Sequence, residues 1–339
     1  MKNVIAIICA IMVFAGSCGH KNPGAETTVG NEAMLTEKAA LIEMDTVEKY
    51  IPIKIIIEKE LLYDQHTLAD TFPYKDTVRF FQWDKIREQL RIVDSMQMDR
   101  PLWGVLQNKN NVNGEAPLVV QWERNEYKRV ADMYGVERYQ SVPLYTVADS
   151  VPTRYGRDGF PVKVIRSDST DKMMTIETVD FPGRWLVPKK YVKVTSDTVR
   201  YNKVAMVDRT MQTIAMMERV GDRWLVRSMN PATTGAHHPP YQQPTPLGIF
   251  VMQEKKAKML YTHDGSSEIA GYAPWASRFS NGGYIHGVPL NSVNASTIEF
   301  SSTLGTIPRS HMCVRNATSH AKFVYDWTQA LNALVIVIE

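Results

Sequence analysis

One cysteine and two histidines in the last quarter of the chain are the residues best suited to nucleophilic chemistry. Cys313 lies in the segment Ser-His-Met-Cys-Val-Arg-Asn, and His286 lies in Tyr-Ile-His-Gly. A free thiol has a pKa of about 8.5, so an adjacent imidazole is needed to remove its proton at neutral pH. His286 is suited to this role at the end of a strand, where Gly287 lets backbone approach closely. His311 shares a face with Cys313 only if the segment between them is extended.

Acyl transfer also needs hydrogen-bond donors for a tetrahedral oxyanion and a group that holds the substrate. The backbone N–H groups of Met312 and Cys313 are the expected oxyanion donors, because a turn would expose them. Arg315 is placed to bind a substrate carboxylate, since its planar guanidinium matches that group. The sequence therefore predicts a cysteine acyltransferase site at 310–316.

Two other interpretations of these residues stay open at this point. They could hold a zinc ion, although their spacing fits no common zinc pattern; the ligands would be His286, His311 and Cys313 with His320 or His263. Alternatively, each residue is simply packed in the core, as buried cysteines often are. We expect no metal and no cofactor.

The composition excludes several classes of protein. The chain has 339 residues, with 39 basic and 36 acidic side chains and a net charge of +3. No basic tract stands out, so we expect no nucleic-acid partner. Three cysteines are too few for a disulfide scaffold. The length predicts two or three domains.

The N-terminus has the pattern of a targeting segment. One lysine and an apolar stretch at 4–14 precede Ala-Gly-Ser-Cys, whose cysteine is Cys18. The apolar stretch is too short to span a bilayer comfortably. Small residues before this cysteine resemble the cleavage box of bacterial lipoproteins, which implies a signal peptide at 1–17, a lipid on Cys18 and a tether at 18–30. An ordinary secretory signal is the alternative.

The resemblance also predicts where the protein lies. It implies a lipid-anchored protein on the periplasmic side of a membrane in a bacterial cell envelope, with that membrane as a partner. Cys313 is then the only free thiol of the mature chain.

The residue pattern of 31–139 predicts a mixed α/β region, whose role the sequence does not show. Isoleucines at 51, 53, 55 and 57 alternate as in a strand. Residues 80–96 carry apolar side chains at helical spacing and predict an amphipathic helix.

Residues 140–195 predict a small β-domain. Short apolar runs at 142–147, 162–165, 173–176 and 185–187 are separated by Gly, Pro and Asp turns. The ending at 183–192 resembles the last strands of bacterial SH3-like barrels, which implies a small accessory barrel.

Residues 196–339 predict a domain of strands with one helix. Strands are expected at 204–208, 213–218, 223–228, 247–253 and 335–338, with a hairpin turn at 221–222. Phe323, Trp327 and Leu331 are spaced as on one face of a helix.

In this order, the motifs resemble the catalytic domain of L,D-transpeptidases of the YkuD type. The resemblance covers about 203–338 and depends on Thr-Pro-Leu-Gly-Ile-Phe at 245–250, Ile-His-Gly at 285–287 and the block around Cys313. It implies a mainly β fold, in which a mixed β-barrel or sandwich follows the α/β region and the SH3-like barrel.

The resemblance implies a role for each residue. Cys313 would be the nucleophile and His286 the proton acceptor and donor. The Gly287 carbonyl would orient the imidazole, while His311 and Ser310 would shape the nucleophile turn. The set expected to contact substrate is Arg315, Ser310, Met312, Tyr284 and Trp275, although the two aromatic residues could equally pack in the core.

The family acts on peptidoglycan stem peptides. By resemblance, the thiolate attacks the third, diamino acid residue, D-alanine leaves, and an amine of a second stem resolves the thioester into a 3–3 cross-link. Water as the acceptor would give an L,D-carboxypeptidase. A catalytically impaired lipoprotein that only binds muropeptides is the further alternative.

Two departures from the family pattern bear on the choice of acceptor. The family usually has Gly where this chain has Met312, whose side chain must point away from the oxyanion and for which a positive φ is unfavourable. The interval between His286 and Ser310 is also long, and 288–307 is interpreted as an inserted loop or hairpin over the site, or as a surface loop without function.

Overall fold

The computed structural model describes residues 53–146 and 149–339, whose regular elements are mainly β-strands, as the sequence predicted. The predicted signal peptide, Cys18 and the tether lie outside the described residues, as does the part of 31–139 before residue 53. Within the described ranges, no helix is both long and apolar enough to cross a bilayer.

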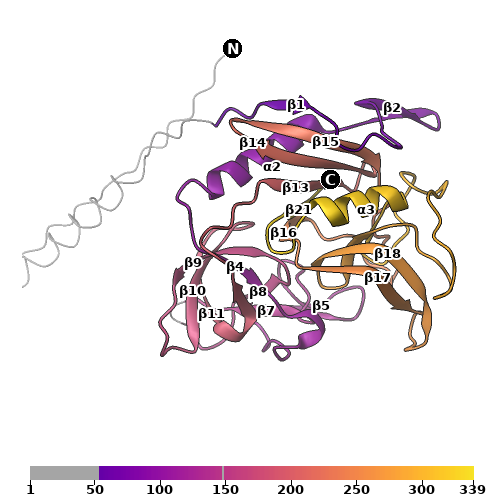
Figure 1. The fold of residues 1–339 in the computed structure, drawn as a ribbon. Coiled ribbons are helices and arrows are strands. Elements are labelled where there is room, and N and C mark those ends of the chain that lie inside the picture. Colours follow the sequence, from indigo (N-terminus) through magenta and orange to yellow (C-terminus); the bar gives the residue numbers. More distant parts are fainter. Residues whose placement is uncertain (1–52, 147–148) are drawn as a thin grey trace, which may run out of the picture. The chain divides into compact units, whose positions relative to one another are not determined.

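A six-stranded sheet lies at the centre of the described part (Figure 1). In order across the sheet, the strands are β1 (Ile57–Lys59), β15 (Arg223–Pro231), β14 (Thr213–Val220), β13 (Lys203–Asp208), β21 (Leu334–Ile338) and β16 (Gly248–Val251). Of the two central pairs, β14–β13 is antiparallel and β13–β21 is parallel. A strand from the predicted N-terminal region, β1, thus extends the sheet of the C-terminal region.

Helix α2 (Trp83–Met96) covers one face of this sheet. Its buried residues Ile86, Leu90 and Val93 recur at helical spacing and pack on Val204 and Met206 of β13. The sequence predicted this helix at 80–96, and the structure confirms it from Trp83 onward. A short hairpin, β2 (Thr71–Tyr74) and β3 (Thr77–Phe80), precedes it.

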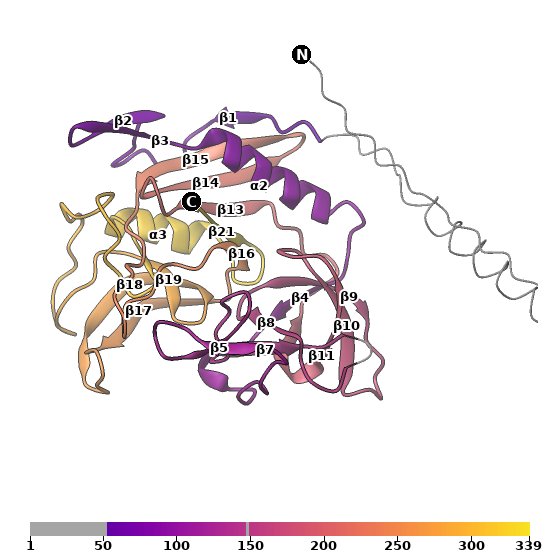
Figure 2. The ribbon, with the colours of Figure 1, turned by 180° about the vertical axis from the view of Figure 1, so that it is seen from behind.

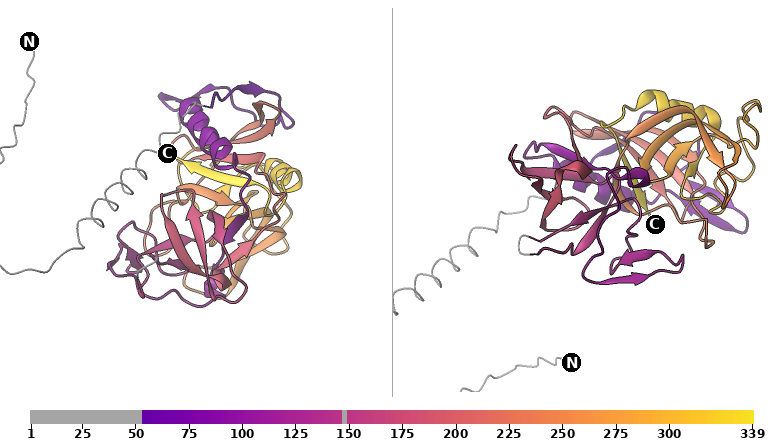
Figure 3. Two further views of the ribbon diagram at one scale, coloured as in Figure 1. Left: turned by 90° about the vertical axis from the view of Figure 1, so that its left-hand side faces the viewer. Right: turned by 90° about the horizontal axis from the view of Figure 1, so that it is seen from below.

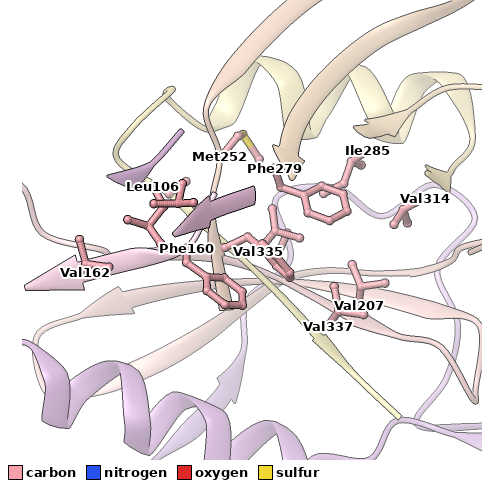
Figure 4. Close-up of a cluster of buried hydrophobic side chains, with 14 of the residues drawn as sticks. Leu106, Phe160, Val162, Val207, Met252, Phe279, Ile285, Val314, Val335 and Val337 are labelled. Atoms are coloured by element: carbon pink, nitrogen blue, oxygen red, sulfur yellow. The ribbon is translucent and has the colours of Figure 1, made fainter. Parts of the chain in front are cut away.

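The other face of the six-stranded sheet packs on a second, four-stranded sheet and on helix α3 (Thr318–Trp327). Val207 and Val335 meet Ile285, Phe279 and Val314 in one buried cluster (Figure 4). The four strands, in order, are β17 (Glu254–Thr262), β18 (Ile269–Ser280), β19 (Gly283–His286) and β20 (Val314–Arg315). This sheet carries the residues singled out from the sequence.

The β-domain contributes a five-stranded sheet whose inner residues, such as Leu106 and Val162, belong to that same cluster (Figure 4). Its strands, in order, are β11 (Arg184–Pro188), β10 (Met173–Thr178), β9 (Pro161–Arg166), β4 (Trp103–Leu106) and β12 (Val192–Val194), with a 3-10 turn, η2 (Lys189–Tyr191), before β12. Because β4 lies between β9 and β12, this sheet takes strands from both sides of the predicted boundary at residue 139.

The segment between β4 and β9 forms an excursion from the sheet, seen beside it in Figures 2 and 3. It contains the 3-10 turn η1 (Lys109–Asn111) and two hairpins. These are β5 (Trp122–Arg124) with β6 (Val130–Asp132), and β7 (Ser141–Leu144) with β8 (Arg154–Arg157).

The prediction that Leu331 continues the helical row of Phe323 and Trp327 was wrong. Helix α3 ends at Trp327, because Thr328 is extended and its hydroxyl donates to the Val324 carbonyl at 2.6 Å. Leu331 lies beyond the helix with φ +66°.

Candidate active site

Cys313 and His286 are brought together by two parallel strands. In the β19–β20 pair, Ile285 lies beside Val314 and His286 beside Arg315. Ile285 and Val314 point into the core, so the alternate residues His286 and Arg315 share the opposite face. Cys313 directly precedes β20 and is two residues from Arg315, which places it on this same face, diagonally across from His286. Diagonal neighbours lie about 7–8 Å apart at Cα, within reach of an imidazole.

The imidazole of His286 is held in one tautomer. Its Nδ1 lies 2.6 Å from the carbonyl oxygen of Gly287. A carbonyl can only accept, so Nδ1 carries the proton and Nε2 is left as the acceptor. The backbone carbonyl of His286 in turn accepts from the N–H of Asn316 at 2.9 Å, which ties the strand to the segment after Cys313.

The pKa values of the two residues favour a neutral pair at rest. Burial lowers the pKa of His286 to about 4, against the Gly287 hydrogen bond, while the charge of Arg315 lowers it further. Burial also raises the pKa of the Cys313 thiol above its ordinary value, although the backbone N–H of Tyr284 and the charge of Arg315 oppose this. These directions predict a neutral thiol and a neutral imidazole at rest, with the thiol donating to the Gly282 carbonyl at 3.4 Å.

The turn before Cys313 has an unusual backbone. Met312 has φ +84°, a region that residues other than glycine seldom occupy. The Thr245 hydroxyl donates to the Met312 carbonyl and accepts from the N–H of Gly235, each at 2.8 Å. A Cβ on Gly235 would lie 2.8 Å from the Met312 Cα, so only glycine allows this approach. The loop that begins at Gly235 and ends at Thr245 therefore supports the strained turn.

The expected oxyanion donors are available. Among the described residues, neither the Met312 N–H nor the Cys313 N–H donates a recorded hydrogen bond. Ser310 is buried, and its hydroxyl donates to the Cys313 carbonyl, so it fixes the turn from within. Ser310 thus shapes the turn and does not face the substrate side.

Arg315 has a guanidinium without a carboxylate partner. In the described part of the chain, no acidic side chain lies within 4.0 Å of it, and its buried Nε has no hydrogen-bond partner. A buried cationic group normally has such a partner. Within the described residues, the guanidinium of Arg315 is therefore not neutralised by a carboxylate.

His311 is not brought to the pair formed by Cys313 and His286. Its side chain is exposed and contacts Asp264, with 2.9 Å between Nε2 and Oδ1. The positive φ of Met312 breaks the extended geometry that a shared face with Cys313 would have required. His311 instead links the nucleophile turn to the tip of the β17–β18 hairpin.

Trp275, expected to contact substrate, lies elsewhere. Its own φ of +54° interrupts the regular alternation of β18, so the contacts of its ring, and not strand alternation, place it. Its ring packs on Tyr325 of α3, with 5.4 Å between the centroids. The structure thus corrects this prediction and favours the packing alternative for Trp275.

Tyr284 does lie on the face of Cys313, within a row of polar residues. Glu254, Arg278 and Tyr284 are aligned across β17, β18 and β19. Burial raises the pKa of Tyr284 to about 12. Its Oη accepts from Lys109 Nζ at 2.8 Å, and Lys109 also pairs with Glu254 at 2.9 Å. The segment between β4 and β9, through Lys109, therefore contacts the strand that carries His286.

The candidate zinc ligands are dispersed among other contacts. His320 is fully buried and bonds to Asn316 and Ser228 at 2.9 Å each, whereas His311 pairs with Asp264. Over residues 53–146 and 149–339, no group of three or more His, Cys, Asp or Glu side chains is arranged to bind a metal.

Comparison with a family model decides the identity of the C-terminal part. Residues 202–337 match the model described as YkuD, L,D-transpeptidase catalytic domain. This part of the chain is a YkuD domain. The match covers every strand of the four-stranded sheet and every residue of the site described above except Lys109.

Solved structures similar to this chain include several L,D-transpeptidases. One from Mycobacterium smegmatis is 17% identical, with 52% of this chain and 82% of that chain covered and a TM-score of 0.33. L,D-transpeptidase 3 from Mycobacterium tuberculosis, solved with a faropenem-derived adduct, is 16% identical, with 58% and 98% covered and a TM-score of 0.33.

A third similar structure is a fused Zn-dependent amidase/peptidase/peptidoglycan-binding protein from Clostridium acetobutylicum. It is 18% identical, with a TM-score of 0.29; the match takes 40% of this chain and about half, 52%, of that one. A search of curated proteins found no match. The identification therefore depends on the family model.

The predicted insertion at 288–307 contains no strand. It packs on other residues of the YkuD domain. Leu290 pairs with Tyr272 in an isolated bridge, and Leu304 packs on Val288. Glu299 accepts from the Ser319 N–H at 3.0 Å, in the first turn of α3. A carboxylate there satisfies a free N–H of the helix and complements its dipole. The loop thus caps α3.

Two contacts from outside the YkuD domain were missed by sequence reasoning. Lys109 lies in a turn cluster without any chemical motif, and its partner Tyr284 is 175 residues away. Tyr127, in the β5–β6 hairpin, bonds through Oη to His237 Nδ1 at 2.8 Å and donates to the Gln242 carbonyl at 3.0 Å. It thereby holds the loop between Gly235 and Thr245. No local signal marks either contact, because each depends on how the segment between β4 and β9 packs on the YkuD domain.

Proposed function

We propose that this protein is a peptidoglycan L,D-transpeptidase that works through a thioester on Cys313. The observation that carries the proposal is the shared face of β19 and β20, where Cys313 lies diagonal to a His286 whose tautomer is fixed. The YkuD identity of residues 202–337 supports the substrate class, since this family acts on peptidoglycan stem peptides.

The first step transfers a proton and forms a bond. His286 Nε2 takes the proton of the Cys313 thiol as Sγ attacks the carbonyl carbon of the third stem residue. The negative charge moves to the carbonyl oxygen, where the N–H groups of Met312 and Cys313 stabilise it. Because both groups are neutral at rest, ionisation occurs as the bond forms and no free thiolate has to be stored.

The second step expels the leaving group. The tetrahedral intermediate collapses, the carbon–nitrogen bond breaks, and the imidazolium of His286 protonates the leaving D-alanine nitrogen. A thioester on Cys313 remains. An amine of a second stem peptide then attacks this thioester, giving a 3–3 cross-link, and His286 again takes and returns the proton.

Arg315 supplies the contact with the donor peptide. Its unpartnered guanidinium lies two residues from the nucleophile, on the same face. A carboxylate of the donor stem would satisfy this group through two parallel hydrogen bonds. This contact fixes the scissile carbonyl over Sγ.

The location of the protein follows from residues outside the described part. We propose that Cys18 carries a lipid and that the chain lies at the periplasmic side of a bacterial membrane, on the strength of the cleavage-box pattern alone. We also keep the proposal of an SH3-like accessory barrel, since β11, η2 and β12 follow one another in the segment that carried the resemblance.

Incubation of isolated cell-wall sacculi with the protein tests the function. We expect wild type to release D-alanine and to form 3–3 linked dimers in the digested muropeptides, and Cys313→Ala to form neither. Trimmed tripeptides without dimers would instead indicate the carboxypeptidase. The absence of both products, with the wall fragments still bound, would leave the binding protein.

A further inference from the structure

A cavity of about 400 Å³ opens where the β-domain meets the four-stranded sheet. Four cationic side chains line it, together with one acidic side chain, Asp158. The cations are Lys109, Lys190, Lys193 and Arg278. The lining therefore carries a net positive charge.

Two of these cations are fixed and neutralised by the protein. Arg278 is almost fully buried and pairs with Asp158 at 2.6 Å and with Glu254 at 3.1 Å. Lys109 pairs with Glu254 and donates to Tyr284. Burial alone would raise the pKa of Glu254, but its pairs with Lys109 and Lys256 outweigh burial and lower this pKa to about 2. These pairs make a rigid floor, because each charged group has its partner.

The other two cations are not neutralised. Lys190 and Lys193 are exposed, and no carboxylate among the described residues lies within 4.0 Å of either. Both are carried by short regular elements, η2 and β12. Lys193 lies opposite Val105 of β4, within the β-domain sheet. Two free ammonium groups are thus held at the edge of the cavity by ordered backbone.

The cavity lies on the catalytic face of the sheet. Arg278 is paired across the strands with Tyr284, and Tyr284 lies beside Cys313 at the next strand. Two strand spacings separate Arg278 from Cys313, or about 10 Å. An extended peptide covers this distance with about three residues. A stem peptide attached at Cys313 is therefore long enough to reach the cavity.

We propose that this cavity is a second subsite that binds a carboxylate of a peptidoglycan stem peptide, with Lys190 and Lys193 as its ligands. The identity of the peptide rests on the proposed function, whereas the preference for a carboxylate rests on the two free ammonium groups. Ammonium–carboxylate hydrogen bonds are among the stronger polar contacts, and a partly enclosed site preserves them better than open surface does. The β-domain thereby takes part in substrate recognition.

Binding of a disaccharide-tetrapeptide muropeptide to the full chain tests the proposal. All proteins carry Cys313→Ala, so that no turnover occurs, and binding is followed by calorimetry. We expect Lys190→Gln with Lys193→Gln to raise the Kd about tenfold or more, which is the effect of losing one charged contact. The matched control, Lys54→Gln with Lys75→Gln, removes two exposed lysines that do not line the cavity and should leave the Kd unchanged.

Two further measurements separate this proposal from the proposed function. The same muropeptide with its carboxylates amidated loses the Arg315 contact as well, so it should bind the parent protein at least as weakly as the acid form binds the Lys190/Lys193 variant. The two lysine substitutions should not weaken the binding of this amidated form further. The wild-type chain, which retains Cys313, should be acylated by a carbapenem, and this reaction reports on the proposed function alone. Equal Kd values for the two double variants, or no measurable binding to the parent, would overturn the subsite. Failure of the wild type to be acylated, with the lysine dependence intact, would overturn only the proposed function.

Discussion

The Nδ1 atom of His286 donates its proton to the carbonyl oxygen of Gly287, 2.6 Å away. A backbone carbonyl therefore does what a carboxylate does in many catalytic triads: it fixes the tautomer and the ring orientation. Unlike a carboxylate, it adds no full negative charge, so it does little to hold a proton on the imidazole. This difference explains why burial dominates and the pKa of His286 falls to about 4.

The pH dependence of acylation follows from this low value. The imidazole is neutral above about pH 5 and can accept the thiol proton there, so we expect the rate of acylation by a carbapenem to be nearly constant between about pH 5.5 and 8. As the pH falls through about 4, His286 takes a proton and the rate should drop. Stopped-flow measurement across this range would show it.

The same experiment has a spectroscopic control. Because burial raises the pKa of the Cys313 thiol, its thiolate absorbance should be absent at neutral pH. A rate that falls near pH 6.5, or a thiolate signal at pH 7 that Cys313→Ala lacks, would mean a thiolate–imidazolium pair at rest and would contradict this account.

Substitutions of Met312 test whether the backbone there is strained. Its φ of +84° suits glycine and is most costly for β-branched residues. We expect Met312→Val to lower the free energy of unfolding by about 1–3 kcal/mol. Met312→Gly should stay within about 1 kcal/mol of wild type, since relief of strain offsets the added entropy of the unfolded chain. Urea denaturation distinguishes the two, and equal losses would contradict a strained turn.

Gly287 has no room for a side chain. A Cβ there would lie 2.8 Å from Thr318 Oγ1 and 2.9 Å from Pro274 Cγ. We expect Gly287→Ala to lower the free energy of unfolding by about 1–3 kcal/mol, as overpacking does, and to slow acylation by displacing His286. Gly282→Ala is the control for stability, because nothing lies within 4 Å of its added Cβ. A fully active, equally stable Gly287→Ala protein would show that the carbonyl position is not critical.

His311 and His286 should differ sharply when replaced. Loss of the exposed pair with Asp264 is worth at most about 1 kcal/mol, so His311→Ala should retain acylation within about threefold. His286→Ala removes the proton acceptor and should slow acylation by about 10²-fold or more. Mass spectrometry over time measures both rates. An equally severe loss in His311→Ala would place that histidine in the chemistry.

The sequence identified Cys313 and His286 because each lies in a short, distinctive segment, but it could not show that they share a face. That relation depends on the parallel pairing of β19 and β20. Nor does any local pattern reveal that the ring of Trp275, in β18, packs against Tyr325 of α3. The sequence left open whether His311 shares a face with Cys313, because the answer depends on the backbone of one residue, Met312, whose φ is positive.

Strand and helix positions were predicted where their periodicity was local. The helix α2 and the strands β9 and β10 lie close to the predicted ranges, since alternating or helical spacing marks them. Strand β4 was missed because its four residues are all buried and carry no alternation. Its place at the centre of the β-domain sheet is set by packing with chain more than 50 residues away.

Formation of a covalent bond at Cys313 is the central claim, and the intact mass of the protein after exposure to a carbapenem tests it most directly. The mass of wild type should rise by one drug molecule, and that of Cys313→Ala should not change. A wild-type mass without the adduct, or an adduct that persists in Cys313→Ala, would contradict the account.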